Sequence, residues 1–126
     1  MGKLKAMVIE DETALRIIYE RVLTKTDYEV LLARDGQQAI ELLRGITPDL
    51  IFLDMLLPNI SGLVVLEFIA QQPAIANHAH IVIASSSKEY EQYTSLAPSC
   101  EFILKPILPT QIRDIALALQ EARQGR

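Results

Sequence analysis

The sequence predicts an α/β fold in which short parallel strands alternate with helices. Two observations lead to this prediction. Short apolar runs recur along the chain between longer amphipathic stretches, and three of them are apolar without interruption, at residues 6–9, 50–53 and 81–84. Such runs suit strands that are buried on both faces, as in a parallel sheet covered by helices. Parallel strands joined by helical crossovers imply a doubly wound, three-layer sandwich.

The expected elements are a strand and a helix repeated five times. We expect the strands at residues 6–9, 29–33, 50–53, 81–84 and 101–104. We expect the helices at residues 13–24, 36–44, 63–72, 88–96 and 109–123. The first helix carries Leu15, Ile18 and Val22 at helical spacing. Gly45 and Pro73 are expected to end the second and third helices.

Length and composition restrict the class of protein. The 126 residues fit one domain, residues 1–126, and leave no room for an output domain. Half of the residues are hydrophobic, which supports a buried core and excludes general disorder. The net charge of -4 argues against direct binding of nucleic acid. Apolar runs of four residues are far shorter than the ~20 that a membrane helix needs, and we expect no membrane contact.

Polar residues stand where the apolar runs stop. The first run ends at Glu10 and Asp11, the third at Asp54, the fourth at Ser85 and the fifth at Lys105. The carboxyl ends of parallel strands lie at one edge of a sheet, where ligands bind in such folds. These side chains converge if the four strands are neighbours.

The chemistry of this set of residues indicates phosphoryl transfer. Three carboxylates at close range repel one another, and burial makes their charge more costly. Lys105 offsets one charge, and a hard divalent ion such as Mg²⁺, which prefers oxygen ligands, can offset the rest. Asp54 would then be the nucleophile, with the metal and Lys105 screening the transferring group.

The same residues resemble the receiver domain of bacterial response regulators, the CheY-like family of two-component signalling. The resemblance lies in residues 8–12, in residues 49–58 with Gly62, in residues 81–85 and in the pair Lys105 and Pro106. It covers nearly the whole chain, and its motifs occur in the expected order and spacing. It implies a flavodoxin-like (βα)5 fold with the strand order 2-1-3-4-5.

The resemblance also implies a role for each residue of the acidic site. Asp54 would accept a phosphoryl group from a histidine kinase or phosphotransfer protein. Asp11, Asp54 and the backbone carbonyl of Leu56 would hold Mg²⁺, with Glu10 binding it directly or through water.

Further roles follow for the last two strands. Ser85 would bond the phosphoryl oxygens, and Lys105 would pair with the phosphoryl group. Phe102 would be the aromatic switch residue, turning inward as Ser85 moves. The bond between Lys105 and Pro106 would be cis.

An aromatic group is a candidate partner face. Tyr90 and Tyr93 stand three residues apart in the expected helix 88–96. With Phe102 and the last helix they would form the face that such domains use for partners. Ordinary, partly exposed packing is the simpler explanation of the two tyrosines, and both interpretations stay open.

Several positions depart from the commonest pattern of the family. Glu10 replaces Asp, Ser85 replaces Thr and Phe102 replaces Tyr. Leu56 occupies a position that helps to place the hydrolytic water in relatives, and its side chain cannot hydrogen-bond water. We therefore expect slow autodephosphorylation.

The sequence thus predicts a single-domain response regulator that is a signalling switch and not an enzyme. We expect a cytoplasmic protein, in keeping with its one cysteine, Cys100, and a monomer or weak dimer with a downstream protein target. Two alternatives remain, a receiver-like module that is not phosphorylated and a flavodoxin-like cofactor binder. His78 and His80 have no evident partner and are expected in loops.

Overall fold

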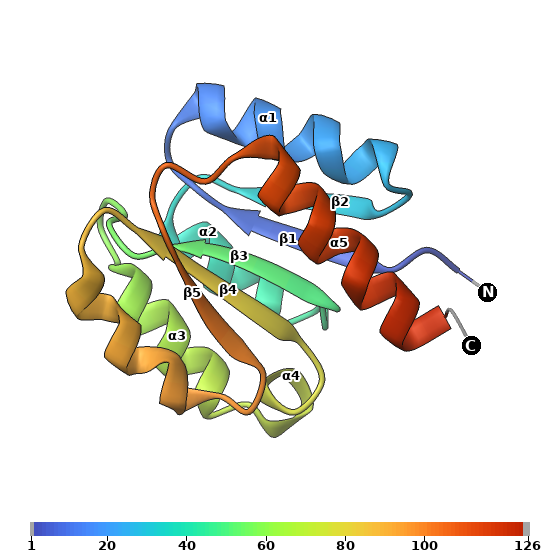
Figure 1. Ribbon diagram of the computed structural model, residues 1–126. Helices are drawn as coiled ribbons and strands as arrows, with labels where there is room; N and C mark the ends of the chain where they lie inside the picture. Colours follow the sequence, from blue (N-terminus) through green and yellow to red (C-terminus); the bar gives the residue numbers. More distant parts are fainter. Residues whose placement is uncertain (1, 125–126) are drawn as a thin grey trace.

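The computed structural model describes residues 2–124, which form a parallel sheet between two layers of helices (Figure 1). The strands are β1 (Lys5–Ile9), β2 (Glu29–Ala33), β3 (Leu50–Asp54), β4 (His80–Ser85) and β5 (Cys100–Leu104). Their order is β2-β1-β3-β4-β5, and every neighbouring pair is parallel. The predicted α/β class and the strand order implied by the resemblance are both confirmed.

Helices cover both faces of the sheet. They are α1 (Thr13–Lys25), α2 (Gly36–Leu43), α3 (Gly62–Ala70), α4 (Pro73–Ala76), the 3₁₀ helix η1 (Lys88–Leu96) and α5 (Pro109–Gln124). The helices α1 and α5 lie on one face, and α2 and α3 lie on the other (Figure 1). Side-chain caps set three of the starts, and at η1 the cap is Ser87, whose Oγ accepts from the backbone N–H of Glu89. An oxygen of Asp35 accepts from the backbone N–H of Gln38, and Ser61 Oγ accepts from that of Val64.

Two sequence expectations need correction. Pro73 was expected only to end a helix, but it also begins α4 at the first helical turn. A proline fits there because its missing N–H would have no partner in the first turn of a helix. His80 was expected in a loop, but it is the first residue of β4 and pairs with Leu50 of β3.

The sheet divides the core into two halves. Residues such as Met7 and Ile9 of β1 face α2 and α3, whereas Ala6 and Val8 of the same strand face α1 and α5. Both sets are buried, which accounts for the uninterrupted apolar runs in the sequence. The central strands are thus buried on both faces, and the polar residues of the site stand at their carboxyl ends.

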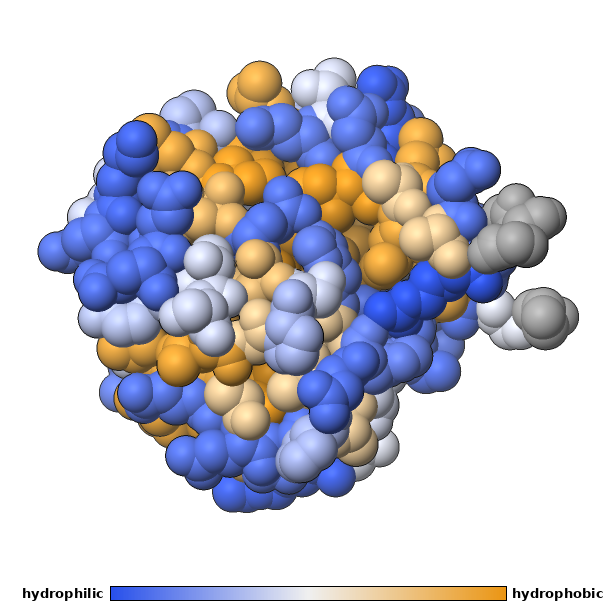
Figure 2. All heavy atoms as spheres, turned by 60° about the horizontal axis from the view of Figure 1, so that its bottom comes forward, coloured by the Kyte–Doolittle hydropathy of each residue, from blue (hydrophilic) through white to orange (hydrophobic). Residues whose placement is uncertain are grey.

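The surface has mixed polarity. On the face shown in Figure 2, polar side chains break the apolar surface into separate areas. Within residues 2–124, no helix combines the length and the apolar character needed to cross a membrane.

Candidate functional site

The predicted site residues meet at the carboxyl edge of the sheet. Glu10 follows β1, Asp54 ends β3, Ser85 ends β4 and Lys105 follows β5. The strands β1, β3, β4 and β5 are successive neighbours in the sheet. The register places Asp54 beside Ala84, the residue before Ser85. The convergence expected from the ends of the apolar runs is therefore present in the fold.

Three carboxylates form the centre of the site. One oxygen from each of Glu10, Asp11 and Asp54 lies within 4.8 Å of the other two. Glu10 and Asp54 are buried, with 2% and 5% of their surface exposed, whereas Asp11 is exposed. Two backbone N–H groups point at the cluster, since Glu12 donates to Glu10 Oε2 at 3.1 Å and Leu56 donates to Asp54 Oδ1 at 3.2 Å.

Lys105 bridges the two buried carboxylates. Its Nζ lies 3.3 Å from Asp54 Oδ1 and 3.4 Å from Glu10 Oε1. The ammonium reaches the cluster from the loop after β5, and the peptide bond from Lys105 to Pro106 is cis. The backbone N–H of Lys105 donates to the carbonyl oxygen of Ser85 at 2.9 Å, which fixes the start of this loop against β4.

One lysine does not compensate for the charge of the cluster. Burial, together with the charge of Asp54, raises the pKa of Glu10 to about 7. Burial also raises the pKa of Asp54, although the Lys105 charge opposes the rise. Burial alone would lower the pKa of Lys105, but the charges of Asp54 and Glu10 outweigh it and the pKa is raised. The site therefore favours an additional cation or proton.

A divalent cation fits this donor set. Hard ions such as Mg²⁺ bind carboxylate oxygens, and here three carboxylates present oxygens at close range. Two of them are buried with only one ammonium between them. Glu10, Asp11 and Asp54 would hold the ion.

Ser85 is the hydroxyl residue of the site. Only 1% of its surface is exposed, and its Oγ accepts from the backbone N–H of Ser87 at 3.1 Å. This bond orients the hydroxyl oxygen at the end of β4, beside the strand that carries Asp54.

The loop after Asp54 approaches the strand closely. A Cβ atom at Gly62 would lie 2.4 Å from the carbonyl oxygen of Asp54 and 2.5 Å from Met55 Cα. Within the loop, Asn59 has φ 67°, a left-handed conformation that asparagine tolerates better than most residues. Glycine at position 62 thus lets the start of α3 pack against the backbone of the site.

Comparisons with known proteins show the family of the chain. A family model of the response regulator receiver domain matches residues 6–117. The chain belongs to the response regulator receiver family. The chemotaxis protein CheY of Thermotoga maritima is 26% identical over 115 residues, which cover 89% of this chain and 92% of CheY. This receiver domain also matches the probable transcriptional regulator ycf27 of Porphyridium aerugineum, with 28% identity over 113 residues.

Solved structures have the same fold. The phosphorylated cyanobacterial phytochrome response regulator RcpA has a TM-score of 0.75 at 28% identity, with 95% of this chain and 93% of that chain covered. The chemotaxis response regulator CheY4 of Vibrio cholerae has a TM-score of 0.82 at 20% identity, with 94% and 99% covered. The receiver domain spans 46% of the length of ycf27 but most of CheY, so its relatives include both longer and similar-sized proteins.

Leu56 is the second residue after Asp54 and is exposed. The residue is 58% exposed, and its backbone N–H donates to Asp54 Oδ1 as described above. The role of its carbonyl oxygen as a metal ligand stays a prediction, as does the effect of its side chain on dephosphorylation.

The aromatic residues of the expected partner face are brought together. The rings of Tyr90 and Tyr93 lie 6.1 Å apart, and both pack with Phe102 against the core on the α2 and α3 side of the sheet. All three side chains are half-buried. This placement is compatible both with ordinary packing and with a switchable surface.

Sequence reasoning missed Arg16. Its guanidinium donates to the carbonyl oxygen of Glu10 at 2.9 Å and to Thr13 Oγ1 at 3.1 Å, which secures the acidic turn to α1. The sequence signal is the position of Arg16 in the first turns of a helix that follows the acidic residues. Arginine is common on exposed helix faces, and the signal alone was not specific.

Proposed function

We propose that Asp54 accepts a phosphoryl group and that the chain is a signalling switch rather than an enzyme acting on a separate substrate. One observation carries this proposal. The Lys105 ammonium lies between the buried carboxylates of Asp54 and Glu10, and Asp11 completes the acidic cluster. This is the combination that phosphoryl transfer to a carboxylate requires, a nucleophile with fixed positive charge beside it and a place for a divalent cation.

The proposed donor is a phosphohistidine on a histidine kinase or phosphotransfer protein. A carboxylate oxygen of Asp54 attacks the phosphorus atom and forms the O–P bond, and the N–P bond of the donor breaks. The electron pair of that bond stays on the imidazole nitrogen, which takes a proton from solvent. Lys105 screens the charge on the phosphoryl oxygens. Mg²⁺, held by Glu10, Asp11 and Asp54, supplies further charge neutralisation when bound.

The proposed output is a change of surface. Phosphorylation adds a charge of about −1.5 to −2 and new hydrogen-bond acceptors. Ser85 and Lys105 would move toward the phosphoryl group, and Phe102 would turn inward from its half-buried position in β5. The responding face would consist of η1, β5 and α5, with Tyr90 and Tyr93 on η1. A downstream protein would bind this face.

The cellular location and the oligomeric state are part of the same proposal. A phosphoacceptor that serves a histidine kinase works where the kinase domain lies, and we place the protein in the cytoplasm as a monomer or weak dimer. The proposal includes no direct contact with nucleic acid.

The proposal is tested by intact-mass spectrometry after incubation with phosphoramidate and Mg²⁺. We expect a phosphoryl increment on the wild-type chain, and no increment after Asp54→Asn or with a chelator. Asp27→Asn is the matched control, because Asp27 is exposed and has φ 70°, which asparagine also tolerates. An unmodified but folded wild-type chain would contradict the proposal and favour a receiver-like module that binds without phosphorylation.

A further inference from the structure

Asp11 differs from the other two carboxylates of the acidic cluster because it is exposed. Glu10 and Asp54 are buried, and each is paired with Lys105. Within residues 2–124, the carboxylate of Asp11 accepts no hydrogen bond and forms no ion pair. Its place beside the other two carboxylates is therefore set by its backbone.

The backbone of Asp11 is held on both sides. Arg16 Nη1 donates to the carbonyl oxygen of Glu10 at 2.9 Å, and this carbonyl belongs to the peptide group before Asp11. The N–H of Glu12 belongs to the peptide group after Asp11, and it donates to Glu10 Oε2 at 3.1 Å. Because each peptide group is planar, holding both groups restricts the φ and ψ of Asp11 between them. Arg16 thus supplies one of the two anchors of Asp11.

The guanidinium of Arg16 is itself fixed to the start of α1. Its Nη2 donates to Thr13 Oγ1 at 3.1 Å, while Nη1 donates to the Glu10 carbonyl. The two bonds leave from different nitrogen atoms of one planar group, a fork that the single ammonium of lysine does not reproduce. Within the part of the chain that the structure describes, Arg16 forms no ion pair, so these two hydrogen bonds set its direction.

Helix stability does not account for this arrangement. Arg16 is the fourth residue of α1, and the helix dipole favours anions rather than cations at this end of a helix. The side chain of Glu12, the residue before the helix, forms no capping hydrogen bond either. What the arginine provides is a link between the start of α1 and the acidic turn.

We propose that Arg16 is a positioning residue for the divalent cation of the acidic site. It acts through the peptide group between Glu10 and Asp11, which it holds so that the Asp11 carboxylate faces the other two. Without this anchor, the exposed Asp11 side chain would spend less time within reach of the ion. The inference rests on the proposed function, in which Glu10, Asp11 and Asp54 hold Mg²⁺.

Mg²⁺ binding by the ¹⁵N-labelled full chain tests the proposal. The amide signals of Asp11 and Leu56 are followed by NMR during a Mg²⁺ titration and give the dissociation constant. Arg16→Lys keeps the charge but removes the fork, and it should raise this constant about threefold to tenfold, the range for one net hydrogen bond. An unchanged constant would overturn the proposal, because the charge alone would then be sufficient.

Arg21→Lys is the matched control. Arg21 is exposed on the same helix, and within residues 2–124 it forms no hydrogen bond or ion pair. The same substitution there should change the dissociation constant by less than about twofold. Equal effects of Arg16→Lys and Arg21→Lys would mean that any arginine of α1 serves, and would overturn the proposal.

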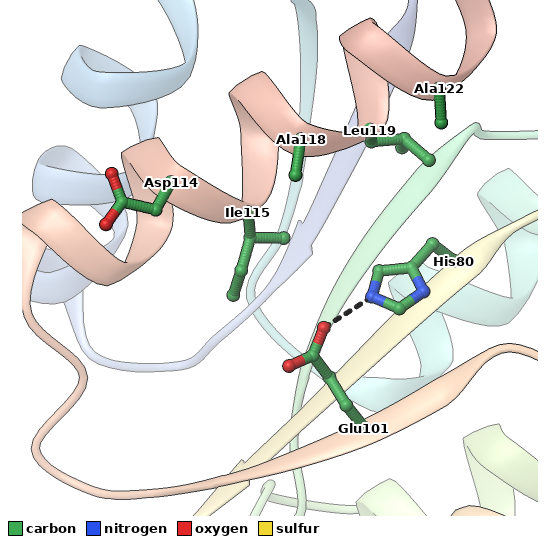
Figure 3. Close-up of a pocket in the computed structure, with 7 residues that line it drawn as sticks. All are labelled: His80, Glu101, Asp114, Ile115, Ala118, Leu119 and Ala122. Carbon is green, nitrogen blue, oxygen red and sulfur yellow. Dashed lines mark hydrogen bonds and ion pairs between the residues drawn. The ribbon is translucent and has the colours of Figure 1, made fainter.

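Signals far from the acidic site serve as the reference. Ala118 and Leu119 lie on α5, along a groove whose opposite side is formed by His80 and Glu101 (Figure 3). In this groove His80 Nε2 lies 2.6 Å from Glu101 Oε2, near the amino ends of β4 and β5. The acidic cluster lies at the carboxyl ends, so the amide signals of Ala118 and Leu119 should not follow the titration. Shifts of equal size there and at the acidic turn would mean unspecific binding and would overturn the proposal.

A second variant tests the fork from its other end. Thr13→Val removes the hydroxyl that accepts from Arg16 and leaves the arginine charge in place. Thr13 is exposed, so the variant should stay folded. It should weaken Mg²⁺ binding, and the double variant with Arg16→Lys should bind no more weakly than Arg16→Lys alone, because both changes break the same link. Fully additive effects would show that Arg16 does not act through this link, and would overturn the proposal.

Phosphorylation by phosphoramidate separates positioning from chemistry. Within the described residues, Arg16 forms no hydrogen bond with Asp54 or Lys105. Arg16→Lys should therefore raise the Mg²⁺ concentration that gives half of the maximum rate and leave the maximum rate unchanged. A lower maximum rate at an unchanged Mg²⁺ requirement would overturn the proposal.

The same data distinguish this inference from the proposed function. If the wild-type chain binds Mg²⁺ with the expected dependence on Arg16 but is not phosphorylated, only the phosphoacceptor role of Asp54 fails. If the wild-type chain binds Mg²⁺ and is phosphorylated but Arg16→Lys has no effect, only the role of Arg16 fails. A folded wild-type chain that binds no Mg²⁺ would overturn both.

Discussion

Gly62→Ala is the substitution for which the structure predicts the clearest cost. The added methyl group would lie 2.4 Å from the carbonyl oxygen of Asp54 and 2.5 Å from Met55 Cα. Both neighbours are backbone atoms, one in the last residue of β3 and one in the residue that follows it, so neither can swing aside as a flexible side chain would. Overpacking of this kind costs about 2–3 kcal/mol of stability, which corresponds to roughly 10 °C in Tm for a domain of this size.

The assay is urea unfolding followed by circular dichroism. The midpoint should fall while the slope with urea stays the same, since the surface exposed on unfolding does not change. Gly45→Ala is the control, because nothing lies within 4 Å of a Cβ there and the described glycines have no positive φ. Alanine should leave stability unchanged or raise it by up to about 1 kcal/mol at that position. A loss of less than about 0.5 kcal/mol in Gly62→Ala would refute the close-approach reasoning.

The remaining predictions concern the acidic site, the hydrogen bond between Tyr28 and α5, and the lifetime of the phosphoryl group. Burial and the charge of Asp54 raise the pKa of Glu10 from 4.5 to about 7, so the folded metal-free chain binds this proton more tightly than the unfolded chain. The free energy of unfolding of the chain should therefore fall by at most about 3 kcal/mol as pH rises from about 4.5 to about 7. Urea titrations at several pH values measure this fall, which should be smaller for Glu10→Gln and in the presence of Mg²⁺. Tyr28→Phe removes the buried hydrogen bond to Ala116 and should cost about 1 kcal/mol in urea unfolding, and an unchanged midpoint would count against that bond. If Asp54 is phosphorylated as proposed, Leu56→Asn should shorten the half-life of the phosphoryl group in a mass-spectrometric decay series, because the amide can hydrogen-bond water where leucine cannot, and equal half-lives would contradict the shielding role of Leu56.

The acidic site was predictable because its residues directly follow apolar runs, which are visible in the local sequence. Apolar runs long enough for buried strands end at Asp54 and Ser85, and parallel topology brings such ends together. The order of the strands in the sheet, in contrast, was not predictable from such local signals. It came from the resemblance, since neither run length nor periodicity says which strands are neighbours.

Contacts between distant residues were not predictable in the same way. Asp49 receives the backbone N–H of Lys5 at 2.7 Å, and it also contacts His78 and Arg123. Arg123 is 74 residues away in the chain, and nothing local marks this group as a cluster. The expectation that His78 and His80 lack partners was therefore wrong for both. His80 pairs with Glu101 because β4 and β5 are adjacent, which again depends on topology.

The short edge strand β5 joins two parts of the molecule that have been described separately. Glu101 and Lys105 are four residues apart, which corresponds to about 13 Å along a strand. Phe102 lies between these two residues on the same strand. Any shift of β5 along its axis would move both side chains together. Such coupling is reciprocal by thermodynamic necessity, so a partner that binds Glu101 more tightly after the shift would itself favour the phosphorylated state.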